Sequence, residues 1–485
     1  MTPSHRCLRR PARLAGAVLA LLPVLPIAGS LAAQTVPAPA PPAASTLQDK
    51  VAQLEKLLAQ TRQELAAVRA QLAAQGASQA DQQKLQELER RIEILAREIE
   101  ALKIGEAAAP SEDGSSRYGV GPAAAKVYRG KAGVSIGGYG EFQYNNLASR
   151  RQDGAPSEAA SHIDLARAVV YLGYKFDDRF VLNTEIEFEH AVTASDKGGE
   201  VAIEFAYLDW MHRRPFNLRA GLVLVPLGLV NEFHEPTVFS GTRRPDVETF
   251  LIPTTWRELG AGVWGEAGAF TYRGYVTNGL NAAGYDALGI REGRQEGSKA
   301  LAGSWAGSGR LDWAGAAGLV VGGAFFVGGS GQGQALAGGR TFAGLTTLFE
   351  VHGIWQWRGL DLRGLYVHTS VSDAALINQL NDLAGDESVG SRQLGWYLQG
   401  GYDLLWLKPG ARTSLTLFTR YEKLDTQSAV PAGYRKNPAN DRSVWTAGLS
   451  FKPIDRLVVK ADYQWKRNAA STGINQWNVG LGYVF

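Results

Sequence analysis

Residues 474–485 read INQWNVGLGYVF, and this stretch decides the fold. Counting back from Phe485, bulky side chains fall on every second position, with Asn, Gly or Val between them. A period of two belongs to a β-strand with two unlike faces. Chain ends are commonly frayed, whereas this one closes on Tyr483, Val484 and Phe485. The segment is either an ordinary edge strand or the strand that closes a cylinder by pairing with the first one.

The same alternation runs through residues 133–485. In 133–146, 179–191 and 455–466, apolar residues face one way and polar, often charged, residues face the other. About sixteen such segments can be counted, so the predicted fold class is all-β. They begin near residues 133, 162, 179, 199, 215, 257, 268, 300, 316, 341, 359, 390, 410, 440, 455 and 473.

The connections between these segments alternate in length. Residues 177–178, 213–215, 408–410 and 453–455 are tight turns, whereas 147–161, 227–256, 280–299, 372–389 and 425–439 are long and polar. An even number of strands with short turns on one rim and long loops on the other is typical of an antiparallel up-and-down transmembrane β-barrel.

A soluble sandwich with buried apolar faces is the competing interpretation, and two features favour the barrel. The predicted strands are longer than the five or six residues usual in soluble sheets. Tryptophans gather at strand ends, where a membrane interface places amphipathic rings. These are Trp210, Trp355, Trp357, Trp406, Trp445 and Trp465.

Residues 1–33 have the composition of a secretory signal peptide. They hold four arginines, no acid, an apolar stretch over 14–27 and small residues near the end. Removing these arginines from the formal net charge of +3 leaves about −1, so nucleic acid is not an expected partner. The single cysteine, Cys7, lies in this segment, and the rest of the chain has no thiol for a disulfide or a metal site.

The region between the signal and the barrel contains a predicted coiled coil at 47–104. A Pro/Ala linker precedes it at 34–46, and a Gly-rich linker follows at 105–132. Apolar residues repeat with heptad spacing from Leu47 to Leu72 and again from Leu85 to Leu102, with Thr61 at one seam position. Because the two seams are out of register, the helix either stutters or folds back near Gly76. The coil oligomerises or spaces the barrel, and its seam permits trimers or dimers.

Several pieces of the β region resemble the phosphate-selective porin O and P family. They are HIDLARAVVYLGYKFDDRFVLNTEIEFEH (162–190), AYLDW (206–210), LRAGLVLVPLGLVNEFHEP (218–236), FLIPTTWRELGAGVWGE (250–266) and GYVTNGLN (274–281). The resemblance implies a sixteen-stranded homotrimeric channel in the outer-membrane lipid of a Gram-negative bacterium, with the coiled coil in the periplasm. It also implies an inward-folded loop, here 227–256. The aromatic end of the final strand separately resembles the assembly signal of bacterial outer-membrane barrels, which implies that the barrel-assembly machinery recognises Leu481, Tyr483 and Phe485.

Basic residues on the predicted lumen side are candidates for anion binding, because a fixed cation replaces hydration that an anion gives up in a narrow pore. They are Arg167, Arg219, Arg243, Arg244, Arg257, Arg273, Arg420 and Lys460, joined by Arg363 and Arg412. Arg167 matches a basic position of the family, although Ala166 stands where a second basic residue is expected. They are opposed by Glu185, Glu187, Glu189, Glu200 and Glu204. The lumen either prefers anions such as phosphate, carries a transverse field, or is weakly selective.

No motif supports catalysis. The sequence contains no GxSxG nucleophile elbow and no HExxH zinc motif, and GGSGQGQ at 328–334 lacks the lysine of a phosphate-binding loop. We therefore expect no enzyme activity, no catalytic or metal-binding residues and no cofactor. The predicted function is passive diffusion of small hydrophilic solutes, with anions as one option. The alternative is a barrel that mainly anchors a tether to the cell envelope or to a periplasmic partner.

Overall fold

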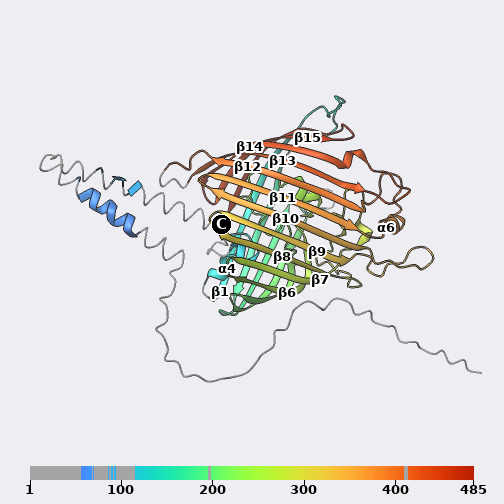
Figure 1. Cartoon of the computed structure of the whole chain (residues 1–485), viewed down its shortest axis with the longest axis horizontal. Helices are drawn as coiled ribbons and strands as arrows, with labels where there is room; N and C mark the ends of the chain where they lie inside the picture. The colour runs from blue at the N-terminus through green and yellow to red at the C-terminus, as the bar shows by residue number, and fades with distance from the viewer. Residues whose placement is uncertain are drawn as a thin grey trace, which may run out of the picture. The chain divides into compact units, whose positions relative to one another are not determined.

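Sixteen antiparallel strands form a closed barrel in the computed structural model of the chain (Figure 1). The structure describes residues 56–67, 69, 86, 89–90, 92–93, 115–130, 132–194, 198–408 and 413–485. Every strand pairs with its neighbours in sequence, and β16 pairs with β1, so the predicted up-and-down order is confirmed. The strands are β1 (Gly133–Leu147), β2 (His162–Lys175), β3 (Phe180–Glu189), β4 (Val201–Arg213), β5 (Phe216–Leu224), β6 (Arg257–Ala267), β7 (Phe270–Asn278), β8 (Trp305–Ala316), β9 (Leu319–Gly329), β10 (Leu345–Trp357), β11 (Leu360–Val371), β12 (Arg392–Asp403), β13 (Ser414–Ala429), β14 (Asp441–Ile454), β15 (Leu457–Asn468) and β16 (Gln476–Val484).

The carboxyl-terminal strand closes the wall. Trp477 lies opposite Asn146 and Leu481 opposite Phe142 in the β1–β16 register. The backbone N–H of Phe485 donates to the carbonyl of Gly138 at 2.9 Å, and the Gly138 N–H donates back at 3.2 Å. The ordinary edge strand is therefore excluded. Closure leaves no open row of backbone groups, each of which costs several kcal/mol in hydrocarbon.

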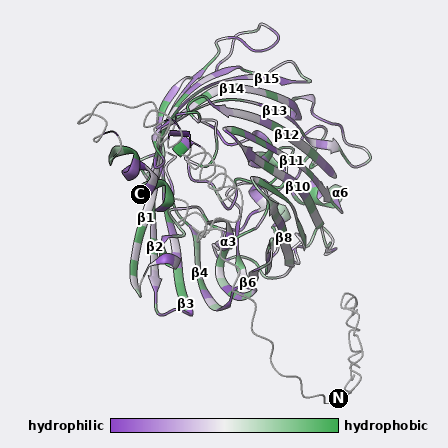
Figure 2. Ribbon diagram, turned by 60° about the vertical axis from the view of Figure 1, so that its left-hand side comes forward, coloured by the Kyte–Doolittle hydropathy of each residue, from purple (hydrophilic) through white to green (hydrophobic). Residues whose placement is uncertain are grey.

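The two faces of the wall have opposite polarity, as predicted. Along β1, Val134 and Ile136 are 66% and 58% exposed, whereas Glu141 and Asn145 are 4% and 2% exposed. Figure 2 shows hydrophobic and hydrophilic residues alternating along the strands. The outer surface is apolar and the lumen is polar, which is the reverse of a water-soluble protein and is typical of a transmembrane barrel.

Most connections follow the prediction, and each strand begins within five residues of its expected start. Two differ: residues 404–413 join β12 to β13 where a tight turn was expected at 408–410, and β13 continues to Ala429, inside the loop expected at 425–439. We call the end with short connections the turn rim and the end with long connections the loop rim. The helices outside the coiled-coil region are short: α3 (Ser115–Tyr118), α4 (Lys126–Arg129), α5 (Asp246–Phe250) and α6 (Ala374–Leu380), with 3-10 turns η1 (Ala282–Gly284), η2 (Arg291–Gly293) and η3 (Pro438–Asn440). None of the helices in the described ranges is both long and apolar enough to cross a membrane.

The predicted coiled-coil region is helical over residues 56–67. Thr61 is buried there and donates to the carbonyl of Leu57 at 2.8 Å. Arg69 Nη2 lies 2.9 Å from Glu89 Oε1, although twenty residues of straight helix span about 30 Å. The choice between a stutter and a fold-back near Gly76 concerns residues that lie outside the described ones. A coiled coil is not shown, because most seam residues, like the signal peptide and the linker 34–46, lie outside the described residues.

Candidate functional site

The connection between β5 and β6, residues 225–256, folds into the lumen, and we call it the inner loop. His234 Nε2 lies 3.1 Å from Glu185 Oε1 on β3. Four residues later, the carbonyl of Val238 accepts a hydrogen bond of 2.8 Å from Arg363 on β11. Because β3 and β11 lie eight strands apart in a ring of sixteen, the loop crosses the lumen from wall to wall. The inward folding expected for 227–256 is confirmed.

The inner loop is held in shape by a buried carboxylate. Glu248 on α5 accepts the backbone N–H groups of Leu229 at 2.8 Å and Val230 at 2.7 Å, and the hydroxyl of Tyr397 on β12 at 2.6 Å. Burial raises the pKa of Glu248 above its ordinary value. Around it, Val247, Leu251, Ile252 and Trp256 are fully buried in an apolar cluster. The loop is thus a packed element rather than a loose lid.

A second segment also lies inside the barrel. Residues 115–130, which we call the inner segment, carry α3 and α4 and contact inward-facing side chains of the wall. The Tyr128 hydroxyl donates to Asp209 Oδ2 at 2.7 Å, and the Tyr128 ring stacks on Tyr118 with centroids 3.8 Å apart. Asn183 donates to the carbonyl of Ala124 at 3.1 Å. Sequence analysis placed these residues in the linker 105–132 and did not reveal that they pack against the wall.

The inner segment and the inner loop are joined through Glu235. Its Oε1 accepts the backbone N–H groups of Ala123 at 2.9 Å and Ala124 at 3.4 Å. Burial is the main reason that the pKa of Glu235 rises to about 7, with His234 and the two N–H groups opposing the rise and Glu185 adding to it. This carboxyl therefore titrates near neutral pH.

Five of the eight candidate basic residues are paired with lumen carboxylates. Three of these ion pairs are short. The distances are 2.8 Å from Arg219 Nε to Asp209 Oδ1, 2.8 Å from Arg420 Nε to Glu422 Oε1, and 2.9 Å from Arg257 Nη1 to Glu204 Oε1. Arg273 Nε lies 2.8 Å from Glu232 Oε1, and Arg167 Nε lies 3.5 Å from a carboxylate oxygen of both Glu141 and Glu187. Arg363 is likewise paired, with Asp361 at 2.8 Å. Arg412 lies outside the described residues.

The other three, Arg243, Arg244 and Lys460, have no carboxylate within ion-pair distance in the described part of the chain. Lys460 is buried on β15, donates to the carbonyl of Gly241 at 2.9 Å and lies over the ring of Phe239. Arg243, also on the inner loop, is exposed. The Nε and Nη2 atoms of Arg244 are buried without a hydrogen-bond partner among the described residues. Burial and the neighbouring Arg167 lower the pKa of Arg244.

One buried cluster contains a histidine but has the character of an ion-pair network. His352 on β10 contacts Glu350 at 2.9 Å and Asp312 at 2.8 Å, and Asp312 also accepts from Arg310 at 2.8 Å. Arg310 in turn bonds the carbonyl of Gly228 in the inner loop. No group of three or more His, Cys, Asp or Glu residues among the described positions is arranged to hold a metal ion. The cluster positions the inner loop against the wall.

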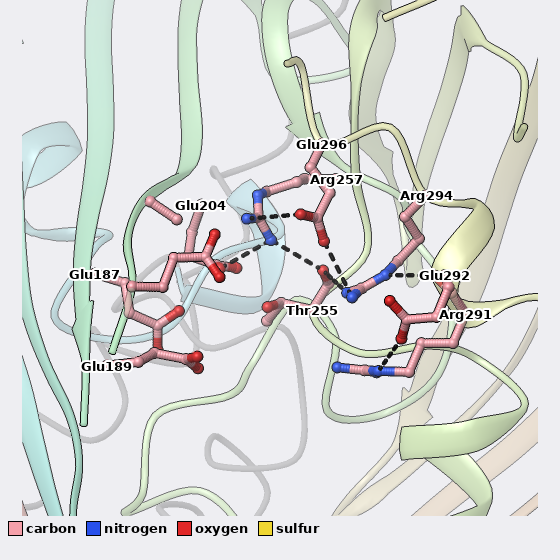
Figure 3. A pocket seen from close by; sticks show the side chains of 11 residues that line it. Glu187, Glu189, Glu204, Thr255, Arg257, Arg291, Glu292, Arg294 and Glu296 are labelled. Carbon is pink, nitrogen blue, oxygen red and sulfur yellow. Dashed lines mark hydrogen bonds and ion pairs between the residues drawn. The ribbon is translucent and has the colours of Figure 1, made fainter. Parts of the chain in front are cut away.

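Two cavities flank the inner loop. The larger, about 890 Å³, opens at the turn rim and is lined by the inner loop, the inner segment and residues of β8–β14 and β16. The smaller, about 200 Å³, lies at the loop rim among charged side chains of β3, β4, β6 and the β7–β8 connection (Figure 3). It includes Arg291 and Arg294, which sequence analysis did not select because they follow no strand pattern.

Comparison with known proteins identifies one close relative in sequence. No protein-family model matches the chain. An uncharacterized protein of Aquifex aeolicus (strain VF5) is 39% identical over 354 residues, which cover 71% of this chain and 78% of that protein.

Three solved structures are similar in overall backbone, each covering 73% of this chain. OmpT of Vibrio cholerae in its trimer form is 14% identical, is covered over its full length and has a TM-score of 0.45. The complex of Salmonella typhi OmpF with daunomycin is 11% identical, covered over 97%, with a TM-score of 0.47. The outer-membrane channel DcaP of Acinetobacter baumannii is 12% identical, covered over 97%, with a TM-score of 0.45.

Proposed function

We propose that this chain, which belongs to the same family as the Aquifex aeolicus protein, is an outer-membrane porin. It forms a water-filled channel through which small hydrophilic solutes diffuse passively. The observation that carries the proposal is the inversion of polarity in a closed wall. Apolar residues such as Ile163, Leu398 and Val276, which are 83%, 64% and 58% exposed, face outward, and an exterior of this kind suits hydrocarbon.

The inner loop is the proposed constriction. It crosses the lumen between β3 and β11 and leaves cavities of about 890 Å³ and 200 Å³ at the two rims. Solutes that pass between the rims move along this loop, where Arg243 and Arg244 supply the positive charge that no carboxylate of the described residues pairs. Anion preference, with phosphate as one candidate solute, rests on these two arginines rather than on the paired residues of the wall.

Planar-bilayer recording of the purified full chain tests the proposal. Steady, ohmic single-channel steps are expected. If the channel prefers phosphate, phosphate added at low concentration to chloride solutions is expected to block the chloride current. A barrel that stays soluble without detergent, or that inserts and conducts no current, contradicts the channel.

An anchoring function is the second candidate, and the inner segment favours it. Residues 115–130 occupy lumen space beside the inner loop, and the preceding chain contains the predicted coiled coil. In that case the barrel holds a tether in the membrane and its lumen stays blocked, so the same bilayer recording separates the two functions. Association into trimers and recognition of the carboxyl-terminal strand, with Leu481, Tyr483 and Phe485, by assembly machinery remain proposals.

A further inference from the structure

The connection between β12 and β13 is the longest one at the turn rim. It runs over residues 404–413, whereas β10–β11 and β14–β15 turn over 358–359 and 455–456. It begins with LLWLK at 404–408, which we call the apolar turn, while the β2–β3 connection on the same rim reads FDDR over 176–179. A run of consecutive apolar residues in a surface turn is unfavourable in water and calls for a function.

The apolar turn has a fixed shape. Asp403 Oδ1 accepts the backbone N–H groups of Leu405 at 3.0 Å and Leu415 at 2.8 Å, which joins the start of the turn to β13. The Leu404 N–H donates to the carbonyl of Leu415 at 2.9 Å, and the Lys408 N–H donates to that of Leu405 at 2.9 Å. Because these hydrogen bonds hold the turn, the exposure of its side chains is a property of the fold.

Trp406 fixes the apolar turn to the outer face of the wall. Its Nε1 donates at 2.6 Å to the hydroxyl of Tyr402, an exposed residue of β12. The indole also lies against the β10–β11 turn, because a Cβ on Gly359 would come within 2.6 Å of the ring. The Asp403 N–H donates to the carbonyl of Gly359 at 2.8 Å. The two neighbouring turns therefore form one surface.

The side chains around this contact are apolar and exposed. Trp355 and Trp357 stack with centroids 6.2 Å apart and are 40% and 48% exposed. Leu404 and Leu407 are 47% and 70% exposed, and Leu404 continues, in steps of two, the outward row that contains Leu398. Tryptophans concentrate where hydrocarbon meets lipid headgroups. Since the outer wall faces hydrocarbon, lipid is the covering that suits this continuous apolar surface beyond the strand ends.

Two cations border the same surface. The Arg358 guanidinium carbon lies 4.7 Å from the centroid of the Trp357 ring, and Arg358 is exposed. Lys408 follows Leu407 and is also exposed. Neither side chain has a carboxylate within ion-pair distance in the described part of the chain. Arginine and lysine both bind phosphate, and cations next to a membrane attract anionic headgroups.

We propose that the apolar turn inserts into the leaflet at the turn rim and that Arg358 and Lys408 bind the phosphate group of an anionic phospholipid there. Short turns of transmembrane barrels face the periplasm, so this is the periplasmic leaflet. A free phosphate would use the two cations but leave Leu404 and Leu407 in water. A phospholipid satisfies both, because its acyl chains cover the leucines while its phosphate pairs with the cations. The inference rests on the membrane placement of the proposed porin and needs no conduction.

Fluorescence quenching in vesicles tests the insertion of the turn. In a Cys7→Ser background, the same environment-sensitive dye is attached to Leu407→Cys in the apolar turn, to Leu398→Cys on β12 and to Asp178→Cys in the β2–β3 turn. The vesicles contain phosphatidylcholine and phosphatidylglycerol, and a fraction of the lipid carries a nitroxide on its acyl chain. Quenching is expected at Leu407→Cys and Leu398→Cys. It is not expected at Asp178→Cys, where the natural side chain is 97% exposed on the same rim.

Native mass spectrometry of the detergent-purified full chain tests headgroup binding. The probe is dioleoyl phosphatidylglycerol, and dioleoyl phosphatidylcholine is the zwitterionic lipid with the same acyl chains. The anionic lipid is expected to bind more tightly, and Arg358→Gln and Lys408→Gln should each weaken its binding about fivefold. Arg179→Gln removes an exposed cation from the β2–β3 turn and is the matched control, which should bind like the wild type. Heat-modifiable gel mobility verifies that each variant is folded.

Quenching at Leu398→Cys without quenching at Leu407→Cys overturns the inference and leaves the membrane barrel standing. Absence of quenching at both positions removes the barrel from the membrane and with it the proposed porin. Equal affinity for the two lipids, or displacement of phosphatidylglycerol by inorganic phosphate, also overturns the lipid site. Disulfide cross-linking of two copies through Leu407→Cys overturns it in favour of a contact between copies. A chain that shows quenching and selective lipid binding but conducts no current keeps the lipid site and loses the channel.

Discussion

Removal of one hydroxyl, in Tyr128→Phe, should loosen the inner segment. The Tyr128 hydroxyl donates to Asp209 Oδ2 at 2.7 Å and accepts from Arg219 at 3.2 Å. The same hydroxyl lies 3.0 Å from that of Tyr207, so the change removes its contacts with Asp209, Arg219 and Tyr207. Asp209 keeps its two hydrogen bonds from Arg219, at 2.8 and 2.9 Å, and is not left unpaired. A hydrogen bond to a charged group contributes about 1.5–3 kcal/mol, and a loss of ~2 kcal/mol raises the population of the released segment roughly thirtyfold.

Cysteine labelling measures that population. The only natural cysteine is Cys7, so a Val127→Cys substitution places a single thiol on the folded part of the chain. Val127 is 2% exposed and packs against the backbone at Gly173, so a maleimide reaches it only after release. When closing is faster than labelling, the labelling rate follows the open population. The rate should therefore rise about thirtyfold in Tyr128→Phe.

The matched control is Tyr285→Phe. Tyr285 is also a buried tyrosine, and its hydroxyl lies 2.9 Å from that of Thr346, far from the inner segment in the strand order. This variant should leave labelling at Val127→Cys unchanged. An unchanged rate in Tyr128→Phe, or an equal rise in the control, would refute the reasoning that the Tyr128–Asp209 bond retains the segment.

Three further outcomes are expected. Because the folded pKa of Glu235, about 7, exceeds its ordinary value, this carboxyl stabilises the folded chain at low pH, and that contribution is lost as pH rises from the ordinary value to about 7. The free energy of unfolding of the detergent-purified chain should therefore fall from pH 5.5 to 8.5, and Glu235→Gln should abolish this change. The double variant of Arg243 and Arg244 to Ala should shift the zero-current potential in a salt gradient toward cation preference; an unchanged potential places the filter elsewhere. Deletion of Phe485 removes two backbone hydrogen bonds of the closing seam and should reduce the heat-modifiable folded form.

The wall was predictable because a period of two is a local property. In β16, each outward position from Trp477 to Leu481 follows from counting in steps of two, and the register with β1 follows from closure. The strand starts were located to within five residues for the same reason. The inward fold of the inner loop came from a family resemblance, since nothing in the local pattern of 225–256 distinguishes it from other long connections.

The charge pairs of the lumen were not predictable from alternation alone. Arg219 and Asp209 stand directly opposite each other, but only the β4–β5 register brings them together. The β-bulge of β4 at Glu204 has no local sequence signal. The inner segment was missed because its apolar residues, Tyr118, Val120, Val127 and Tyr128, stand in a short Gly- and Ala-rich stretch without a regular period.

Pairing inside the barrel explains which charges are available to solutes. A buried ion without a partner costs several kcal/mol, and accordingly Arg219, Arg273 and Arg420 each face a carboxylate. The charged side chains that lack such a partner among the described residues are therefore the ones whose charge is available to solutes. Arg244 on the inner loop is one of them, because its Nε and Nη2 atoms are buried without a hydrogen-bond partner among the described residues. The positive charge that the lumen carboxylates leave unpaired is thus on the inner loop, which is why the proposed anion preference is tested at Arg243 and Arg244.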